Sequence, residues 1–206
     1  TKASQATTYT KTEVDTEITN RSFGFKNYII NGGFDVWQRG ESGTNGYQAD
    51  RWFLSTGGAS LTTEKLNGSV KNYMRLTVNT VGSVIMQQQI EDARTLNGKT
   101  VTLSFEIDAN TTTTITSLEV YIQQKFDNSG IGDTITPIQT IDISAGGIFS
   151  TTFTLPSSAN VLRGINSKLT TNFKIGTQTG ILAITNVQLE EGSVATPFEQ
   201  RPYGLE

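Results

Sequence analysis

The stretch Thr100-Val101-Thr102-Leu103-Ser104-Phe105-Glu106-Ile107-Asp108 decides the fold class of this chain. Its apolar and polar side chains alternate strictly, which is the period of a β-strand with one buried side and one solvent-facing side. The apolar side predicts a half-buried strand in a sheet that covers a core. The residues on that side are Val101, Leu103, Phe105 and Ile107.

Similar strand patterns fill the sequence on both sides of this stretch. They are separated by turn signals such as Asn31-Gly32-Gly33, Asn97-Gly98 and Gly146-Gly147. Many short strands at this spacing predict an all-β fold, a jelly-roll β-sandwich. Glu91–Leu96 is a candidate for one helical turn. The other expected strands are Asn27–Ile30, Phe34–Gln38, Asp50–Ser55, Ser60–Leu66, Asn72–Val78, Val81–Glu91, Thr116–Phe126, Thr134–Ser144, Phe149–Leu155, Lys168–Ile175 and Gly180–Glu190.

The N-terminal part of the sequence has a different pattern. Thr10-Lys11-Thr12-Glu13 is a capping box, and Val14 and Ile18 follow it on one helical stripe. We expect a short helix there, which either packs against copies of itself as a coiled coil or caps the head as a frayed turn. The predicted organisation is a stalk end over residues 1–22 and a head domain over residues 23–206.

Composition excludes several classes of function. The 206 residues include no cysteine and no histidine, so disulfides, thiolate metal sites and Ser-His-Asp chemistry are excluded. Charged residues make up 17% and the net charge is −3, which does not indicate a nucleic-acid partner. No apolar run is long enough to span a bilayer, so membrane insertion is not expected.

The outward-facing residues of three strands indicate a candidate binding surface. If Val81–Glu91, Thr100–Asp108 and Thr116–Phe126 are neighbours, their polar rows share one sheet surface. Amides, carboxylates and hydroxyls with one aromatic ring are suited to sugars, although an ordinary solvated sheet surface has similar side chains. The candidate ligand-binding residues are Gln87, Gln89, Glu106, Tyr121, Gln123 and Lys125, with Thr102 and Ser104 between them.

Two runs on these strands resemble a known family. Ile85-Met86-Gln87-Gln88-Gln89-Ile90 followed by Leu96-Asn97-Gly98-Lys99-Thr100-Val101-Thr102-Leu103-Ser104-Phe105 is similar to the central part of carbohydrate-binding modules of the galactose-binding-like jelly-roll type. In that family a glutamine-bearing strand precedes a GK-x-x-x-x-SF strand, and both face the ligand groove. This sequence departs from the family in having no tryptophan on those strands.

The two ends of the head resemble a second family, the tip modules of bacteriophage or prophage tail fibres. The resemblance is carried by Tyr9–Asp15, by Asn27–Gly40 with Ala49-Asp50-Arg51-Trp52, and by Gln188–Gly204. It implies a homotrimer at the distal end of a virion tail fibre, joined to other fibre segments. It also implies non-covalent attachment to bacterial surface polysaccharide or lipopolysaccharide, without enzymatic activity. The alternative is a structural module that caps the fibre and drives trimerisation without a ligand.

Aromatic and basic residues near the start of the head are candidates for packing. Trp37 and Trp52 are interpreted as anchors of the core or of a subunit interface, with sugar stacking as a weaker alternative. The interface residues proposed from the sequence are Val14, Ile18, Trp37, Arg39 and Trp52.

Acidic residues raise two further hypotheses. Related jelly rolls bind a structural Ca²⁺ between the start and the end of the module, which makes Asp35 and Glu190 candidate ligands here. Otherwise no cofactor is expected. Glu106 and Asp108 lie two residues apart, and Glu119 on another strand is a possible partner for glycoside hydrolysis. Exposed acidic pairs are common on strands, so hydrolysis is not the favoured function.

Overall fold

The computed structural model describes residues 10–11, 26–108, 115–128, 132–157, 162 and 164–201. Val14 and Ile18, the predicted interface residues of the N-terminal helix, lie outside the described residues. So do the other residues that would form that helix, apart from residues 10 and 11. Within the described ranges, no helix is long and apolar enough to cross a membrane.

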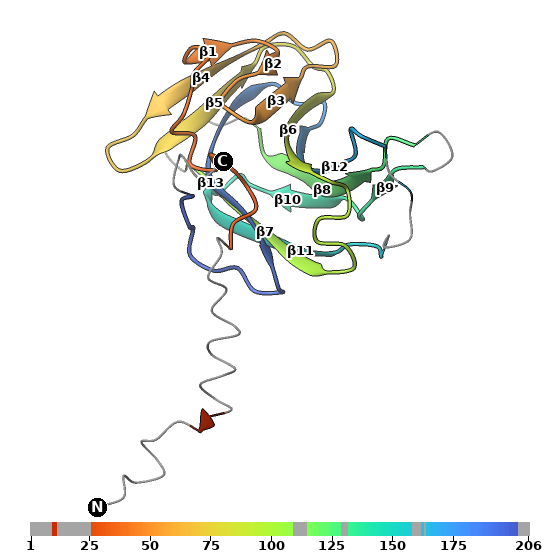
Figure 1. Cartoon of the computed structure of the whole chain (residues 1–206). Coiled ribbons are helices and arrows are strands. Elements are labelled where there is room, and N and C mark those ends of the chain that lie inside the picture. The colour runs from red at the N-terminus through yellow and green to blue at the C-terminus, as the bar shows by residue number, and fades with distance from the viewer. Residues whose placement is uncertain are drawn as a thin grey trace, which may run out of the picture.

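Two antiparallel sheets pack face to face (Figure 1). The six-stranded sheet, called sheet A, contains in spatial order β1 (Ser42–Gly43), β4 (Leu61–Asn67), β5 (Asn72–Val78), β13 (Gly180–Glu191), β7 (Thr100–Ile107) and β11 (Gly147–Thr154). The seven-stranded sheet, called sheet B, contains in order β10 (Gln139–Asp142), β8 (Ser117–Lys125), β12 (Lys168–Ile175), β6 (Val84–Glu91), β3 (Trp52–Ser55) and β2 (Gly46–Tyr47), while β9 (Thr134–Ile135) pairs with β8. The predicted all-β sandwich is confirmed.

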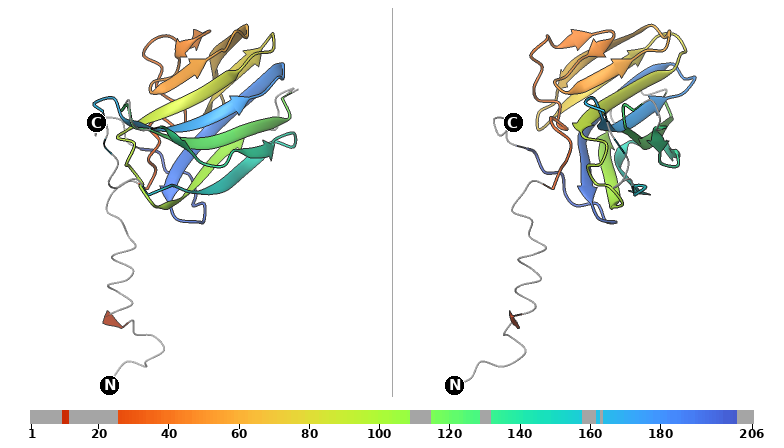
Figure 2. Two further views of the ribbon diagram at one scale, coloured as in Figure 1. Left: turned by 90° about the vertical axis from the view of Figure 1, so that its right-hand side faces the viewer. Right: turned by 45° about the vertical axis from the view of Figure 1, so that its right-hand side comes forward.

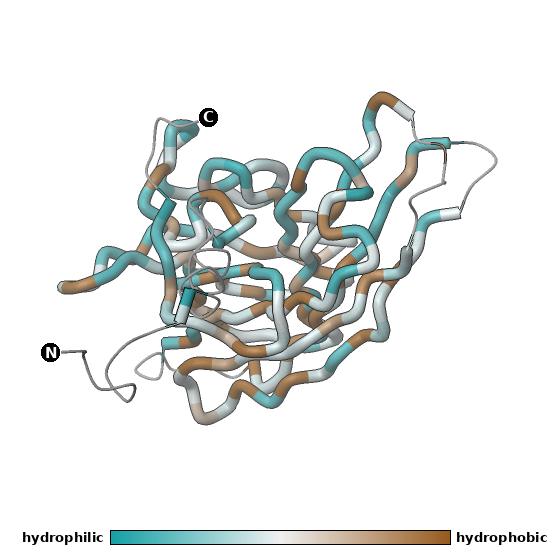
Figure 3. The backbone as a smooth tube through the Cα atoms, turned by 60° about the horizontal axis from the view of Figure 1, so that its bottom comes forward, coloured by the Kyte–Doolittle hydropathy of each residue, from teal (hydrophilic) through white to brown (hydrophobic). Residues whose placement is uncertain are grey.

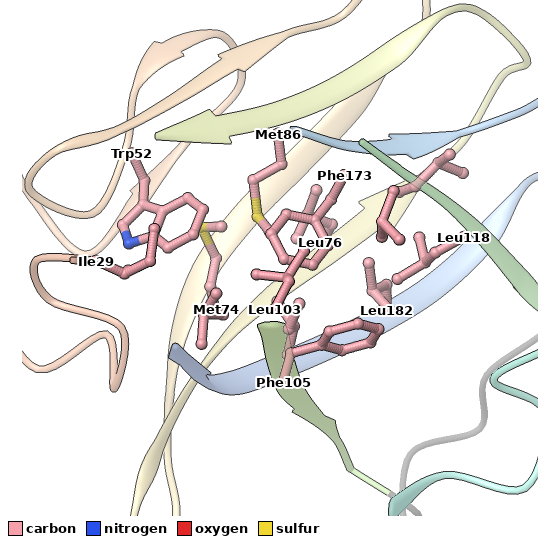
Figure 4. Packing of buried hydrophobic residues seen from close by; sticks show 14 of the residues in the cluster. Ile29, Trp52, Met74, Leu76, Met86, Leu103, Phe105, Leu118, Phe173 and Leu182 are labelled. Carbon is pink, nitrogen blue, oxygen red and sulfur yellow. The ribbon is translucent and has the colours of Figure 1, made fainter. Parts of the chain in front are cut away.

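The core lies between the two sheets. Along the strands the colour of the chain switches repeatedly between hydrophobic and hydrophilic, as the alternation in the sequence predicts (Figure 3). Phe105 of sheet A meets Phe173 of sheet B edge-on, with ring centroids 5.3 Å apart, and both side chains are buried. Figure 4 shows these rings among the aliphatic side chains of both sheets. This interdigitation holds the sheets together and leaves their outer sides as the available surfaces.

Most predicted strands are present, and the differences have local causes. Asn27–Ile30 and Phe34–Gln38 do not form strands, because Asn31 and Phe34 adopt positive φ angles of 54° and 56° that break an extended chain. Glu91 is the last residue of β6, and residues 93–98 form turns instead of the predicted helical turn. The segment predicted as Thr134–Ser144 is divided into β9 and β10.

A segment after the last strand folds back over the outer side of sheet A. We call residues 192–201 the C-terminal strap. Glu190 is buried and accepts hydrogen bonds from the backbone N–H and the hydroxyl of Thr196, at 2.8 and 2.7 Å. Asn27 and Lys26, at the start of the head, hydrogen-bond to Glu199 of the strap. In Figure 1 the dark blue end of the chain accordingly lies beside the orange segment that begins the head.

The two tryptophans belong to the core of the chain itself. Trp52 is fully buried, its indole N–H donates to the Asn31 carbonyl at 3.1 Å, and its ring lies 5.1 Å from that of Phe34. Trp37 is 9% exposed and donates to the Phe34 carbonyl at 2.7 Å. Their assignment to a subunit interface is therefore corrected, because each ring is already covered by its own chain. Arg39 is exposed.

We expect Trp52→Ala to lower the free energy of unfolding by about 3 to 5 kcal/mol, the range for removing a large buried aromatic side chain. Trp52→Phe, which keeps an aromatic ring but loses the hydrogen bond to Asn31, should cost less. Urea denaturation of both variants measures this. A Trp52→Ala protein with wild-type stability and a changed sedimentation mass would instead support the subunit interface.

Candidate functional site

The outer side of sheet B carries a row of five side chains that crosses five strands. Strand register places Tyr47 opposite Phe53, Phe53 opposite Gln87, Gln87 opposite Asn172, and Asn172 opposite Tyr121. Directly opposed residues in antiparallel strands point to the same side of the sheet. We call this set the aromatic–amide row. Figure 2 shows the strands that carry it side by side in one continuous sheet.

Aromatic side chains form one end of the row. The Tyr47 ring is 45% exposed and meets the Phe53 ring edge-on, with centroids 5.3 Å apart. The guanidinium of Arg39 lies 5.2 Å from the centre of the Tyr47 ring. A ring fixed in this way offers a flat apolar surface to a ligand at little cost in side-chain entropy.

Hydrogen bonds fix the amide in the middle of the row. The Asn172 amide nitrogen donates to the Thr170 hydroxyl at 2.9 Å and to the Thr170 carbonyl at 3.1 Å. Asn172 is only 2% exposed, so its orientation is set before any ligand arrives. Gln87 beside it is half-buried. The exposed part of the Gln87 amide can pair with hydroxyl groups of a ligand, while the buried Asn172 supports the row from within the surface.

Tyr121 forms the other end of the row. Burial raises the pKa of its phenol, while the positive charge of Lys174 opposes this effect and the negative charge of Glu119 adds to it. Lys174 and Glu119 form an ion pair at 2.7 Å. Among the described residues, none hydrogen-bonds to the Tyr121 hydroxyl. At neutral pH that hydroxyl is an uncharged donor that is free to bind a polar ligand.

Two further rows follow on the same side of sheet B. Gln89, Thr170 and Gln123 are opposed in the first, and Glu91, Lys168 and Lys125 in the second. Between the second of these rows and the aromatic end lies a groove of about 280 Å³. Side chains that line it include Tyr47, Arg51, Gln89, Glu91, Asn166 and Lys168. The outer side of sheet B thus combines a flat row of side chains with a groove at one end.

Five of the six ligand-binding residues predicted from the sequence lie on this surface, and their role in binding stays a prediction. They are Gln87, Gln89, Tyr121, Gln123 and Lys125. Glu106 does not belong with them, and its placement there is corrected. Strand β7 lies in sheet A, so Glu106 is on the opposite side of the sandwich, as are Thr102 and Ser104.

The acidic residues of sheet A do not form the predicted hydrolytic arrangement. Glu106 pairs with Lys71 and accepts a hydrogen bond from the Asn186 amide at 3.0 Å. Glu119, the proposed partner, lies in sheet B. The two carboxylates therefore belong to different sheets and do not flank one ligand.

The candidate calcium ligands are engaged within the chain. Asp35 accepts hydrogen bonds from Asn72 at 2.6 Å and from Gln200 at 2.9 Å. Glu190 accepts the two hydrogen bonds from Thr196 described above. Its carboxylate oxygens therefore face N–H and O–H hydrogens and are not left for a cation. In the described part of the chain, no cluster of three or more acidic residues could hold a metal ion. The residues present do not fit a calcium site, which needs six to eight oxygen ligands.

Sequence reasoning missed three members of the aromatic–amide row. Phe53 and Asn172 face outward in strands whose alternation is clear from the sequence. The apolar, inward-facing residues of these strands are Trp52 and Leu54 in β3 and Leu169 and Phe173 in β12. Tyr47 lies in a two-residue strand, too short to show a period. For Phe53 and Asn172 the missing information was strand order, and for Tyr47 parity was missing as well.

Comparisons with known proteins describe the fold of this surface. No protein-family model and no curated protein matches the sequence. Among solved structures, a putative sugar binding protein from Bacteroides thetaiotaomicron VPI-5482 aligns with a TM-score of 0.53 and 17% identity, covering 81% of this chain and 100% of that chain. A structure described as "CBM4 structure and function" gives a TM-score of 0.52 and 21% identity, covering 80% of this chain and 99% of that chain.

A phage protein is also among the similar structures. The enzymatically active domain of tailspike protein 4 from bacteriophage CBA120 gives a TM-score of 0.49 and 19% identity, covering 81% of this chain but only 22% of that chain. This chain thus spans about a fifth of that domain. At such identities the comparisons show the fold alone, which is the jelly-roll sandwich of carbohydrate-binding modules.

We expect the phenol of Tyr121 to ionise above the usual value of about 10. Because its folded-state pKa is raised, its contribution to stability is complete below the unfolded pKa and is lost as the pH rises through the folded pKa. The stability of the wild type relative to Tyr121→Phe should therefore fall as the pH rises above about 10. Urea unfolding at a series of pH values tests this, and a constant difference would contradict it.

Proposed function

We propose that this chain is a non-catalytic receptor-binding module at the tip of a phage tail fibre, which attaches to bacterial surface polysaccharide through the outer side of sheet B. The observation that carries the proposal is the aromatic–amide row. It places aromatic rings at both ends of two amides, Gln87 and the hydrogen-bonded Asn172, in register across five strands. Rings cover the C–H surface of a sugar, and amides pair with its hydroxyls.

The arrangement of the two chain ends supports the fibre role. The start of the head and the C-terminal strap meet on the side of sheet A, where Thr102 donates to the Gly192 carbonyl and Lys26 to Glu199. A stalk that precedes residue 26 would enter on that side. The aromatic–amide row would then point away from the fibre, toward a cell surface.

Weak binding by one such surface is compatible with firm attachment. The resemblance of the chain ends to tail-fibre tips implies three copies, and linked sites convert later binding steps into intramolecular ones. A trimer with modest affinity per site would therefore hold a polysaccharide that repeats the same sugar unit.

A structural cap is the second candidate, and it has its own supporting observation. Ile148 in β11 and Val194 in the strap are 79% and 74% exposed. Exposed apolar side chains mark a protein–protein contact where they join into one patch. A trimerisation module without a ligand would use that side of the molecule and leave the outer side of sheet B without function.

We expect Gln87→Ala and Tyr121→Phe each to weaken binding to immobilised bacterial surface polysaccharide by about two- to tenfold, the effect of losing one hydrogen bond. Both changes leave the core side of their strands intact. The matched control is Thr62→Ala on the outer side of sheet A, which should bind as the wild type does. Sedimentation of each variant checks the assembly.

The outcomes separate the two candidates. Loss of binding with an unchanged sedimentation mass supports the receptor-binding module. If no surface polysaccharide binds the wild type, or if both sheet B variants bind as it does, the structural cap is the better explanation. Release of smaller fragments from the polysaccharide would contradict the non-catalytic assignment.

A further inference from the structure

Two lysines on the outer side of sheet B are placed where their charges repel. Lys125 of β8 and Lys168 of β12 are directly opposed in the strand register, and both are half-buried. Like charges at directly opposed positions destabilise an antiparallel pair. A compensating negative charge relieves this repulsion, and no acidic side chain in the described ranges forms an ion pair with either lysine.

The surroundings of the two lysines differ from those of other lysines in the chain. Within the described residues, neither makes an ion pair. The Lys168 ammonium donates to the Gln89 side chain at 3.2 Å, which neutralises no charge. By contrast, an acidic partner accompanies each of Lys65, Lys71, Lys99 and Lys174.

The nearby acidic groups are engaged elsewhere. Glu91 is opposite Lys168 in the register, but its carboxylate lies 3.8 Å from the guanidinium of Arg51. Asp133 accepts hydrogen bonds from the Gln123 amide at 3.2 Å and from the Phe126 backbone at 3.3 Å. Two ammonium groups thus remain without an anionic partner beside the groove.

The groove adds to this positive character. Lys168 and Arg51 line it together with Tyr47, over whose ring Arg39 lies. Glu91 is the acidic side chain in its wall. The whole chain has a net charge of −3, so this is a local concentration of positive charge on an acidic protein. Such a region attracts anionic ligands selectively.

We propose that the groove and the lysine pair beside it bind an acidic polysaccharide, with the ring of one sugar unit against Tyr47 in the groove and the carboxylate or phosphate oxygens of a neighbouring unit at Lys168 and Lys125. This inference rests on the proposed receptor-binding function and specifies its ligand class. Gln89 and Asn166 in the groove wall are available for the hydroxyls of the unit in the groove. The anion relieves the repulsion between the lysines, and charge-assisted hydrogen bonds hold it.

Binding to a panel of immobilised capsular polysaccharides and lipopolysaccharides tests the proposal. Each acidic member is used in its native form, after carboxyl reduction and after removal of phosphate. We expect the native form to bind at least about tenfold more tightly than one of its neutralised forms. The treatment that weakens binding identifies the anion: carboxyl reduction points to carboxylate, and removal of phosphate points to phosphate. Binding should also weaken as the salt concentration rises.

The double variant Lys125→Gln/Lys168→Gln gives the matched comparison on the protein side. It should lose at least about tenfold in affinity for native acidic polymers and bind their neutralised forms as the wild type does. Its thermal midpoint should equal or exceed that of the wild type, because a like-charge pair is removed. Lys99, which directly precedes β7, forms an exposed ion pair with Glu191 on the side of the molecule away from the groove. Lys99→Gln is therefore the single-charge control and should leave binding unchanged.

The results distinguish this inference from the function on which it rests. If the wild type binds neutral polysaccharides as tightly as acidic ones, or binds native and neutralised forms equally, the inference fails and the receptor-binding function stands. The inference also fails if Lys99→Gln weakens binding as much as Lys125→Gln or Lys168→Gln does alone, since the effect would then be one of net charge. If no polysaccharide of either kind binds, both proposals fail.

Discussion

The edge-on packing of Phe173 against Phe105 is the interaction on which the aromatic–amide row depends. Phe173 must point into the core to meet the other sheet, and this fixes which side chains of β12 point outward. Asn172 is then outward, and pairing on both sides aligns it with Gln87 and Tyr121. A slip of one residue in β12 would bury Asn172 without its partners and expose Phe173. The core and the aromatic–amide row are therefore specified by the same constraint.

The sequence alone predicts which side chains of a strand point into the core and which point outward, because this depends only on alternation within that strand. Alternation around Phe105 and Leu103 predicted a sandwich, and it correctly turned Gln87, Gln89, Tyr121, Gln123 and Lys125 outward. It could not assign Glu106 to a sheet, because an outward residue looks the same on either side of a sandwich. Strand order is set by long-range pairing that leaves no local period.

Segments with positive φ angles limited the prediction in another way. Asn27–Ile30 and Phe34–Gln38 have strand-like composition, but the backbone turns at Asn31 and Phe34 and satisfies its polar groups through side chains. The Asn31 amide donates to the Val36 carbonyl at 2.9 Å and its oxygen accepts from the Val36 N–H at 3.1 Å. The chain turned in this way brings Trp37 to the core and places the Asn31 carbonyl where Trp52 of β3 donates its indole N–H. From the sequence alone, a tryptophan in such a segment fits a subunit interface as well as it fits the core.

The C-terminal strap has a consequence for how the domain can be combined with others. Because Lys26 and Asn27 hydrogen-bond to Glu199, the two joints of the head with any flanking chain lie next to each other on the side of sheet A. A domain whose two ends lie next to each other can be inserted into another protein as one continuous segment. Such an insertion does not disturb the outer side of sheet B, which is opposite the two ends. Exchange of the whole unit at these two adjoining joints replaces the outer side of sheet B in a single step, while the position of the joints on sheet A stays the same.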